Sequence, residues 1–229
     1  MTSSKTNLVY KELQKEDVAS MPSTIYFPVL QLVIKRIIDI IGAVTLLVVL
    51  SPIFALTAIL IKLNSPGPVF HIRERVGYNL SPLMMWKFRT MIRNAEELEP
   101  DFRDQGNENG PFFKVRNDPR VTKLGRFFRR YSIDELPQLI NVLKGEMSLV
   151  GPRPLFDHEV RKFIEPKWYR RFIMKPGLTC IWQVNGRSNT SYEDRMRYDL
   201  EYIDNWSLLL DFKLLLKTMP AVLKGDGAV

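Results

Sequence analysis

The sequence has very few of the residues that build disulfide frameworks and metal clusters. Among 229 residues there is one cysteine, Cys180, and there are two histidines, His71 and His158. A single cysteine excludes an internal disulfide framework and indicates a reducing compartment. The segment "HEVRK", which begins at His158, has no second histidine four residues on, so the zinc pattern HExxH is absent. We therefore expect Cys180 to be a small buried residue with no reactive role.

Negative charge is the scarcer sign. The chain has 33 Lys and Arg against 25 Asp and Glu, a net charge of +8 and a pI near 9.6. This balance predicts an anionic partner, which is a phosphorylated substrate, an anionic membrane surface or a nucleic acid. The sequence contains no helix-turn-helix, zinc-finger or RNP signature, so a nucleic acid is not the predicted partner.

One long apolar run is present, at residues 37–61, and its only charged residue is Asp39. About 20 apolar residues suffice for a helix to cross a bilayer, so the run is long enough. It lies too deep in the chain, and is too long, for a signal peptide. A buried helix of a soluble protein is the alternative, but such long runs favour a membrane segment.

Ser51 and Pro52 lie near the middle of this run. Proline removes a backbone donor and clashes with the preceding turn, so we expect a kink, and the serine hydroxyl can satisfy a freed carbonyl. Lys35 and Arg36 before the run and Lys62 after it leave both flanks basic, so the positive-inside preference does not separate them. This symmetry favours a re-entrant helix over residues 35–62, with a plain span as the alternative.

Asp39 would be costly in lipid without a partner. Lys35 and Arg36 lie four and three residues before it, on the same helical face, and we expect them to pair with it. Residues 1–34 read as a polar N-terminal extension with no visible chemistry.

The rest of the chain predicts a mainly helical domain with a small β-sheet. Residues 69–77 and 83–91 have the composition of two strands, and residues 92–99 that of a short helix. Three stretches, at 121–130, 167–175 and 206–217, oppose apolar and basic faces, as helices in the headgroup layer do. The alternative for each stretch is an ordinary helix that turns its apolar face to the core.

Two adjacent acids occur in "FFRRYSIDELPQL", at Asp134 and Glu135. The pattern "SIDE" is a capping box, in which Ser132 caps a helix and Glu135 reaches back to it. Acids beside Arg129 and Arg130 should also have a lowered pKa, which would make them available as nucleophile or metal ligand. Carboxylates that share a site with phosphates suit Mg²⁺.

A second candidate site is "VGPRP", in which Pro152 and Pro154 flank Arg153. Two prolines fix the backbone on either side, and a fixed guanidinium suits bidentate phosphate recognition. A plain loop with a surface arginine is the alternative. A further turn-rich segment, "KPGLTCIWQVNGRS", carries Arg187.

Together these segments resemble the bacterial sugar transferases, the monotopic phosphoglycosyl transferases that act on polyprenyl phosphate. The resemblance covers roughly residues 35–225, and its pieces are "KRIIDI", "LSPIF", "NSPGPVF", "WKFRTM", "DPRVTKLGRFFRRYSIDELPQLINVLKGEMSLVGPRP", "KPGLTCIWQVNGR" and "DNWSLLLDFKLLLKT". Larger family members have additional N-terminal membrane helices, so this chain is expected to be a minimal catalytic form.

The resemblance implies a mechanism. The aspartate of the family's Asp-Glu pair, here Asp134, attacks the β-phosphate of a UDP-sugar in the presence of Mg²⁺, and UMP leaves. Polyprenyl phosphate then takes the sugar phosphate from the covalent intermediate. Glu135 is expected to bind the metal with Asp134 or to position substrate. The residues expected to bind phosphate or nucleotide are Arg129, the unit Pro152, Arg153 and Pro154, and also Lys87, Arg89 and Arg187.

The expected organisation is therefore an extension (1–34), a re-entrant membrane helix (35–62) that contains Lys35, Arg36, Asp39, Ser51 and Pro52, and a catalytic domain (63–229). The protein is expected on the cytoplasmic face of a bacterial inner membrane, where it would start a polysaccharide or glycoconjugate, and a homodimer is a further expectation. Two rival functions are a glycosyltransferase that releases UDP, although no Asp-x-Asp occurs, and a non-catalytic basic adaptor at the membrane surface. The sugar is not specified by any motif.

Overall fold

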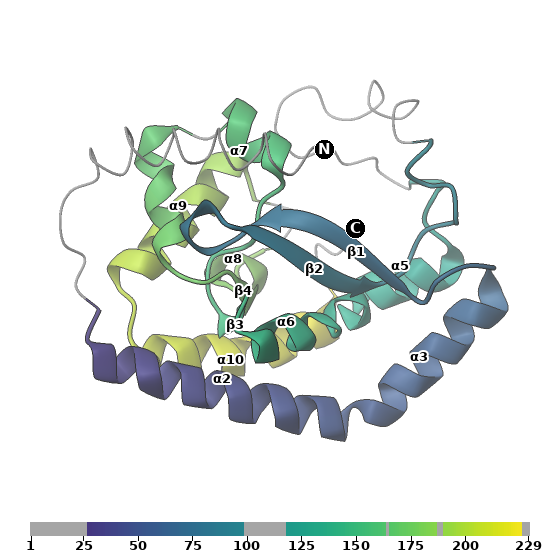
Figure 1. The fold of residues 1–229 in the computed structure, drawn as a ribbon, viewed down its shortest axis with the longest axis horizontal. Helices are drawn as coiled ribbons and strands as arrows, with labels where there is room; N and C mark the ends of the chain where they lie inside the picture. The colour runs from purple at the N-terminus through teal and green to yellow at the C-terminus, as the bar shows by residue number, and fades with distance from the viewer. Residues whose placement is uncertain (1–26, 99–117, 164, 187–189, 226–229) are drawn as a thin grey trace.

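Two helices joined at a sharp bend run along one edge of the molecule (Figure 1). The computed structural model describes residues 27–98, 118–163, 165–186 and 190–225. Helix α2 (Val29–Val49) and helix α3 (Ser51–Asn64) meet at Leu50 with a bend of 60°. The Ser51 hydroxyl donates to the Val48 carbonyl at 2.8 Å, so the predicted break at the Ser-Pro pair is confirmed. Helix α2 begins at Val29, ahead of the expected start at Lys35.

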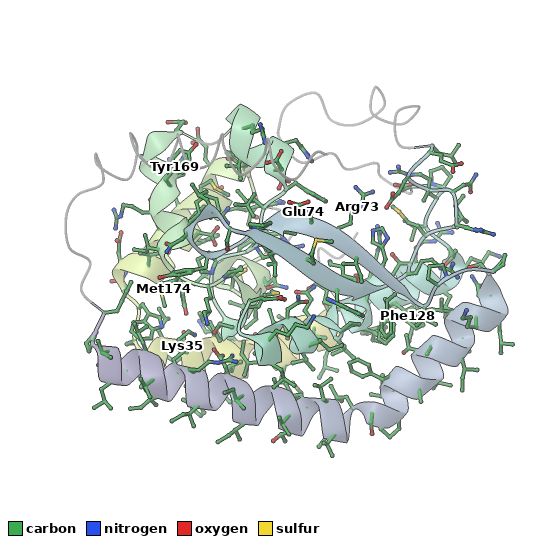
Figure 2. All side chains as sticks on the ribbon, viewed as in Figure 1. Lys35, Arg73, Glu74, Phe128, Tyr169 and Met174 are labelled. Carbon is green, nitrogen blue, oxygen red and sulfur yellow. The ribbon has the colours of Figure 1, made fainter. Side chains whose placement is uncertain are left out.

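The length and composition of α2 and α3 bear on whether they could cross a membrane. In the described part of the chain, no single helix is long and apolar enough to cross a membrane, whereas α2 and α3 together meet that requirement. Large apolar side chains line the outer face of α2 and are between 46 and 71% exposed: Val29, Leu30, Val33, Ile37, Ile41, Val44 and Val48. Figure 2 shows side chains that project outward along this edge, away from the rest of the molecule.

The inner face of α2 is held by polar contacts that differ from those expected. Asp39 accepts hydrogen bonds from the Ser148 hydroxyl (2.9 Å) and the Leu149 amide (2.8 Å). Among the described residues Asp39 forms no ion pair with Lys35 or Arg36, but the charge of Lys35 still stabilises its carboxylate, so the expected pairing holds only as a longer-range attraction to Lys35. A strand edge with free donors lies against the helix, and a buried carboxylate is stabilised by such donors as well as by a cation.

The two basic residues of α2 contact other elements. Lys35 donates to Asp211 at 2.6 Å and to the Val150 carbonyl at 2.9 Å, and it is buried. Arg36 donates to two carbonyl oxygens near the end of α6 (Gln138–Lys144), at 2.6 and 2.8 Å. These bonds fix α2 to the domain that follows it in the chain.

The predicted pair of strands forms a β-hairpin that crosses the face above α2 (Figure 1). Strand β1 (Phe70–Val76) pairs antiparallel with β2 (Pro82–Phe88), with Phe70 opposite Phe88, and the short helix η1 (Tyr78–Leu80) joins them. The helix expected at 92–99 is wrong in its described part, because residues 93–98 form turns. Just before these turns, Met91 forms an isolated β-bridge with Val121, so the backbone there is extended.

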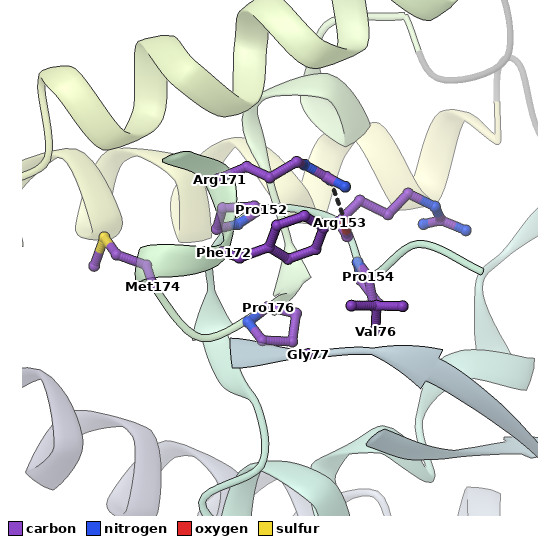
Figure 3. A pocket seen from close by; sticks show the side chains of 9 residues that line it. All are labelled: Val76, Gly77, Pro152, Arg153, Pro154, Arg171, Phe172, Met174 and Pro176. Atoms are coloured by element: carbon purple, nitrogen blue, oxygen red, sulfur yellow. Dashed lines mark hydrogen bonds between the residues drawn. The ribbon is translucent and has the colours of Figure 1, made fainter. Parts of the chain in front are cut away.

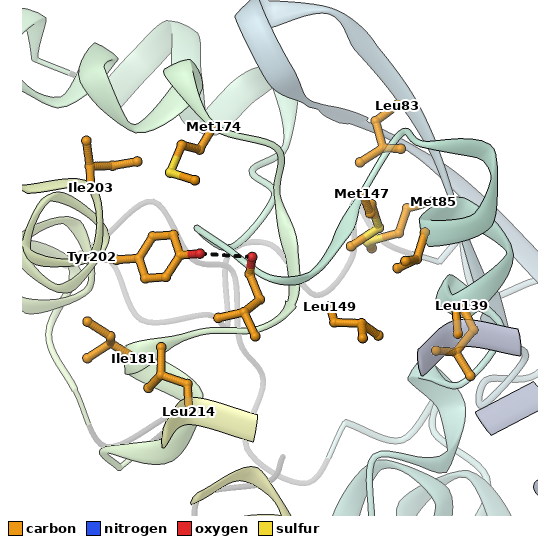
Figure 4. Packing of buried hydrophobic residues seen from close by; sticks show 13 residues of the cluster. Leu83, Met85, Leu139, Met147, Leu149, Met174, Ile181, Tyr202, Ile203 and Leu214 are labelled. Carbon is orange, nitrogen blue, oxygen red and sulfur yellow. Dashed lines mark hydrogen bonds between the residues drawn. The ribbon is translucent and has the colours of Figure 1, made fainter. Parts of the chain in front are cut away.

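A second, parallel pair of strands lies in the centre of the core. Strand β3 (Ser148–Val150) pairs with β4 (Gly177–Thr179), and the connection between them contains α7 (Asp157–Phe163) and η3 (Pro166–Ile173). Figure 4 shows the side chains packed around β3, which include Met147, Leu149, Leu139, Tyr202 and Leu214. The remaining helices are α5 (Lys123–Arg130), η2 (Ile133–Glu135), α8 (Ile181–Val184), α9 (Tyr192–Asp204) and α10 (Leu208–Lys224).

The three stretches predicted to lie in the membrane interface have different environments. In 167–175, Trp168, Tyr169 and Phe172 are buried in a core cluster with Val76, so the interfacial prediction is wrong there and the core-facing alternative holds. This segment is a 3₁₀ helix, whose threefold repeat does not produce the α-helical face assumed from the sequence. In α5, which makes up most of the stretch 121–130, Phe128 is buried, so part of the apolar face of this helix is turned to the core.

Helix α10 differs, because one of its faces is apolar and exposed. Five side chains spaced by three or four residues are between 58 and 69% exposed: Leu209, Phe212, Leu216, Met219 and Leu223. Residues with this spacing lie on one helical face. The opposite face contributes Asp211 and Leu214 to the interior.

Candidate active site

The acid pair lies in a tight turn between α5 and α6. Ser132 has φ of +54° and ψ of +22°, which is left-handed backbone, and its side chain makes no capping bond. The predicted capping box is therefore wrong, because an N-cap residue needs extended backbone. Ser132 instead follows the end of α5, where left-handed residues commonly terminate helices. The turn places Asp134 and Glu135 in η2, with the Asp134 side chain buried.

Side chains from three separate elements surround the acids. Lys87, on β2, places its Nζ 2.7 Å from Glu135 Oε1 and 3.8 Å from Asp134 Oδ2. Gln183, on α8, donates to Glu135 Oε2 at 3.2 Å. Arg153, from the loop after β3, lies 3.6 Å from Glu135 Oε1. Both oxygens of Glu135 are thus engaged, and Lys87 bridges the two carboxylates.

Burial raises the pKa of Asp134 to about 6, from an ordinary value of 3.8. Lys87 opposes this shift, Glu135 adds to it because two negative charges repel, and Arg129 and Arg153 oppose it. The expected lowering is therefore wrong, because loss of water around the carboxylate outweighs the nearby cations. At pH 7 roughly nine in ten Asp134 side chains would still be ionised.

The two arginines before the acids have different positions. Arg129 donates to the Thr90 hydroxyl at 3.1 Å and acts electrostatically on Asp134. Burial lowers the pKa of Arg129, although arginine stays protonated at neutral pH. Arg130 lies over the ring of Tyr131, 5.8 Å from its centroid. Arg129 is the member of this pair whose charge acts on Asp134.

One predicted phosphate-binding residue, Arg89, lies away from the acids, and another lies outside the described residues. Arg89 donates to the carbonyls of Ser65 and Pro66, at 2.8 Å each, and so holds the turn after α3. Arg187 lies outside the described residues. Of the predicted binding residues that the structure describes, it brings together Lys87, Arg129 and Arg153.

The Pro-Arg-Pro loop leaves β3 through a narrow passage beside β4. The Gly151 amide donates to the Thr179 carbonyl at 3.0 Å, and the Gly177 amide donates to the Pro152 carbonyl at 2.9 Å. A Cβ on Gly151 would lie 2.3 Å from the Lys175 carbonyl oxygen, and one on Gly177 would lie 2.1 Å from the Gly151 nitrogen. Glycine is needed at both positions because the two backbones approach so closely.

The Arg153 guanidinium lies over the ring of Trp182, 4.7 Å from its centroid, and its side chain is 34% exposed. Arg195, on α9, lies 4.6 Å from the same centroid. An aromatic ring attracts a cation through its negative face. Burial and then the neighbouring Arg153 lower the pKa of Arg195 to about 10, so it stays protonated at neutral pH.

Three residues of this site escaped prediction: Trp182, Gln183 and Arg195. The only available signal was the matching segment "KPGLTCIWQVNGR", which contains the first two. Arg195 lies in a helix with many charged residues and had no signal. Cys180 is buried as predicted, and burial raises the pKa of its thiol to about 12, which excludes a reactive thiolate at neutral pH.

A hollow lies behind the Pro-Arg-Pro loop, with about 180 Å³ of empty space that is partly open to solvent (Figure 3). Part of that space is open solvent, and the enclosed part is far too small for an ordinary small-molecule ligand. We assign it to the support of the loop. Its lining residues are Val76, Gly77, Pro152, Arg153, Pro154, Arg171, Phe172, Met174 and Pro176.

The donor set at the acids suits a metal that shares its ligands with phosphate. In the described part of the chain, no group of three or more His, Cys, Asp or Glu side chains is placed to hold a metal ion. Two adjacent carboxylates are nevertheless what Mg²⁺ commonly uses when substrate phosphates and water complete its shell. The residues present therefore fit Mg²⁺ in the presence of a phosphate substrate.

Comparisons with known proteins show the family of the chain. The family model described as bacterial sugar transferase matches residues 30–225. The chain is 41% identical over 199 residues to the exopolysaccharide production protein ExoY of Rhizobium meliloti, which covers 85% of this chain and 87% of that protein.

Two longer relatives carry more specific names. The chain is 41% identical to the UDP-galactose-lipid carrier transferase of Erwinia amylovora, over 85% of this chain and 41% of that protein. It is 39% identical to the UDP-N-acetylgalactosamine-undecaprenyl-phosphate N-acetylgalactosaminephosphotransferase of Aeromonas hydrophila, over 91% of this chain and 47% of that protein. The chain thus spans less than half the length of these two relatives.

Proposed function

Because the chain belongs to the bacterial sugar transferase family, we propose that it transfers a sugar-1-phosphate from a UDP-sugar to a membrane polyprenyl phosphate and releases UMP. The observation that carries this proposal is a buried carboxylate, Asp134, in a field of three cations from separate elements. The names of two relatives support the donor and acceptor classes, since one specifies UDP-galactose and the other undecaprenyl phosphate.

The proposed reaction has two steps. An Asp134 carboxylate oxygen forms a bond to the β-phosphorus of the donor, the bond from that phosphorus to the bridging oxygen breaks, and UMP leaves with the electron pair. A phosphate oxygen of the acceptor then attacks the same phosphorus and displaces Asp134. A covalent route suits a site in which one substrate is soluble and the other is in the membrane, because the two need not be bound together.

The raised pKa of Asp134 fits this role. A carboxylate with a pKa of about 6 is more basic than an ordinary one and is still mostly ionised at pH 7. In the described part of the chain, Asp134 accepts no hydrogen bond, and Lys87 approaches it only to 3.8 Å. An oxygen that is not held by a donor is available to attack.

Positive charge around the acids offsets the repulsion between carboxylate and phosphate. Lys87 lies between the two acids, Arg153 is partly exposed beside Glu135, and Arg129 acts on Asp134 from behind. Glu135, with both oxygens engaged, orients Lys87 and Gln183. We propose that it has a positioning role and does not act as a general base.

Asp134 and Glu135 are the residues that would hold Mg²⁺, in place of their contacts with Lys87. When bound, the ion would supply positive charge that neutralises the phosphates and the departing nucleotide. A requirement for Mg²⁺ in nucleotide release would test this assignment.

We also propose that the outer faces of α2 and α3 lie in the inner membrane as a re-entrant pair, with the domain on the cytoplasmic face. The exposed apolar side chains of α2, the bend of 60° and the apolar stripe of α10 support this arrangement. A homodimer across the α10 stripe would be detected by sedimentation of the purified protein in detergent.

Cysteine labelling tests the topology. Cys180 is 1% exposed, so an introduced cysteine is the reactive one. Val29 and Leu63, at the two ends of the helix pair, are 68 and 80% exposed. With Val29→Cys and Leu63→Cys, an impermeant thiol reagent added to spheroplasts should label neither variant and, after lysis, both. Labelling of one variant before lysis would indicate a span and contradict the re-entrant arrangement.

The first experiment identifies the nucleotide that is released. Purified protein in detergent is mixed with Mg²⁺, undecaprenyl phosphate and a panel of UDP-sugars that begins with UDP-galactose and UDP-N-acetylgalactosamine, and UMP is resolved from UDP. Asp134→Asn is assayed beside Asp157→Asn, a control in an exposed ion pair with Arg161. We expect UMP release in the wild type and the control, and none from Asp134→Asn.

Two results would contradict the proposal. Release of UDP would indicate transfer of the sugar alone. Retention of UMP release by Asp134→Asn would exclude the aspartyl intermediate.

A further inference from the structure

We propose that a buried ion pair between Arg171 and Asp199 is a positioning device for the reaction: it holds the main chain of Arg153 and so aims its guanidinium at the donor phosphates. The inference rests on the proposed function, since it assigns a role to Arg153 in phosphate binding. Neither member of the pair was a predicted site residue, and Arg171 belongs to the stretch 167–175, which was expected to be an interfacial helix with a basic face.

The pair contacts both backbone groups of Arg153. Arg171, on η3, donates through Nε to Asp199 Oδ2 at 3.0 Å, and a terminal nitrogen bonds the same oxygen. That terminal nitrogen also donates to the Arg153 carbonyl at 2.5 Å (Figure 3). The Arg153 amide donates to Asp199 Oδ1 at 3.4 Å. The two side chains therefore grip the peptide units on both sides of the Arg153 Cα.

The neighbouring prolines make the hydrogen bonds to the Arg153 main chain decisive for its conformation. Pro152 and Pro154 have no backbone N–H, so the Arg153 amide is the only main-chain donor of the three residues. The prolines also fix φ on either side, which leaves the torsions of Arg153 as the main freedom in the unit. Hydrogen bonds to its amide and carbonyl remove that freedom and determine where its side chain starts.

The position of the Arg153 guanidinium depends on this fixed backbone. The Arg153 side chain is 34% exposed, and its guanidinium has two weak orienting contacts, at 3.6 Å from Glu135 and 4.7 Å from the Trp182 centroid. A fixed backbone confines the side chain to rotamers that maintain both contacts. A displacement of about 1 Å at such a group can cost about 100-fold in rate.

Stability alone is a poor explanation for the pair. Its side chains are 1 and 4% exposed, and desolvation of a buried ion pair commonly offsets the attraction between its charges. Arg171 also has a buried terminal nitrogen with no hydrogen-bond partner among the described residues. Apolar residues of similar volume would join η3 to α9 at least as well, but they could not hold Arg153.

The chain provides a matched control on the same two elements. Arg170 forms an ion pair with Asp204, whose side chains are 24 and 46% exposed. This pair also joins η3 to α9, and the bond between its two side chains does not involve Arg153. Removal of the exposed pair tests the link between the elements, whereas removal of the buried pair also tests the grip on Arg153.

The experiment compares Arg171→Met/Asp199→Val with Arg170→Met/Asp204→Val in detergent. We expect the buried-pair variant to keep an unfolding midpoint close to that of the control and to lose about 100-fold in kcat/KM for UMP release. The control should keep its activity within about twofold, as is usual for exposed pairs.

A double-mutant cycle then separates positioning from structure. Arg153→Ala should cost a large factor in the wild type but less than about threefold when added to the buried-pair variant, because Arg153 is already misplaced there. An equal loss in both backgrounds would overturn the proposal. Should the double variant fail to fold, Arg171→Lys replaces it in the cycle, since it keeps the charge and loses the planar fork.

Hydrogen exchange measures how firmly the main chain of Arg153 is held, and it does not depend on an activity assay. The peptide that spans residues 151–156 should exchange faster in the buried-pair variant, or in Arg171→Lys, than in the control. Unchanged exchange would overturn the inference, whether or not the protein is active. Absence of UMP release by the wild type would instead count against the proposed function, so the two failures are distinguishable.

Discussion

Replacement of the proposed nucleophile should make the protein more stable. Asp134 is buried, and its pKa in the folded state is about 6, against an ordinary value of 3.8. The folded protein therefore holds this proton more tightly than the unfolded chain does. Between pH 3.8 and about pH 6, the free energy of unfolding should fall as pH rises, because the folded state binds more protons.

The size of the effect follows from the shift in pKa. Each unit corresponds to about 1.4 kcal/mol, so at pH 7 or above ionisation of Asp134 destabilises the fold by about 3 kcal/mol. Asparagine has nearly the same shape and no charge, and it resembles the protonated acid. Asp134→Asn should therefore abolish UMP release and raise the free energy of unfolding by about 3 kcal/mol at pH 8.

Chemical denaturation in detergent, with EDTA present to exclude bound metal, measures this difference. Unfolding curves for the wild type and Asp134→Asn are compared at pH 4 and pH 8. The two proteins should have similar stability at pH 4 and differ at pH 8. Asp157→Asn is the control, since Asp157 is exposed in a surface pair and should give a small difference.

Equal stability of wild type and Asp134→Asn at pH 8, or a less stable variant, would refute the reasoning. Either result would mean that the cations near Asp134 outweigh the loss of solvent, so that its pKa is not raised. The same measurement would then remove the argument that Asp134 is unusually basic for a carboxylate.

Three further predictions concern the surroundings of the acids. Lys87→Met should raise the pKa of Asp134 further, so the pH–rate profile of UMP release should move to higher pH, and Lys87→Arg should restore it. The buried Asn141 amide donates to the Met84 carbonyl at 2.8 Å and accepts from the Trp86 amide at 3.1 Å, both on β2. Asn141→Ala removes both bonds and should lower the free energy of unfolding by about 2 to 4 kcal/mol in denaturant titrations. Gly177→Ala places a Cβ 2.1 Å from the Gly151 nitrogen and should lower the unfolding midpoint in a thermal scan by displacing the Pro-Arg-Pro loop.

Several features were determined by local sequence. The break at Ser51 and Pro52 was predictable because proline acts on the turn directly before it, and the serine hydroxyl bonds within the same turn. The hairpin of β1 and β2 was predictable because two β-type segments are joined by a short turn. The burial of Cys180 was predictable because a free cysteine usually behaves as a small buried residue.

Other features depended on which segments meet in space. The order of residues places Arg129 and Arg130 beside the acids, but only the fold brings Lys87 from 48 residues away to within 2.7 Å of Glu135. The expectation for Arg171 failed because a 3₁₀ helix turns that residue into the core, where Asp199 receives it. Asp39 bonds to strand β3 and forms no close ion pair with Lys35, because β3 offers closer donors.

The sequence by itself determined the family pattern, the identity of the acid pair and the position of the helix break, since each depends on residues close together in the chain. Only the tertiary structure decided the direction of the Asp134 pKa shift and the grip on Arg153. The physical reason is that burial and long-range contacts set both. Desolvation depends on every element packed around a group, and in this protein the loss of solvent at Asp134 exceeds the effect of the cations that the sequence places nearby.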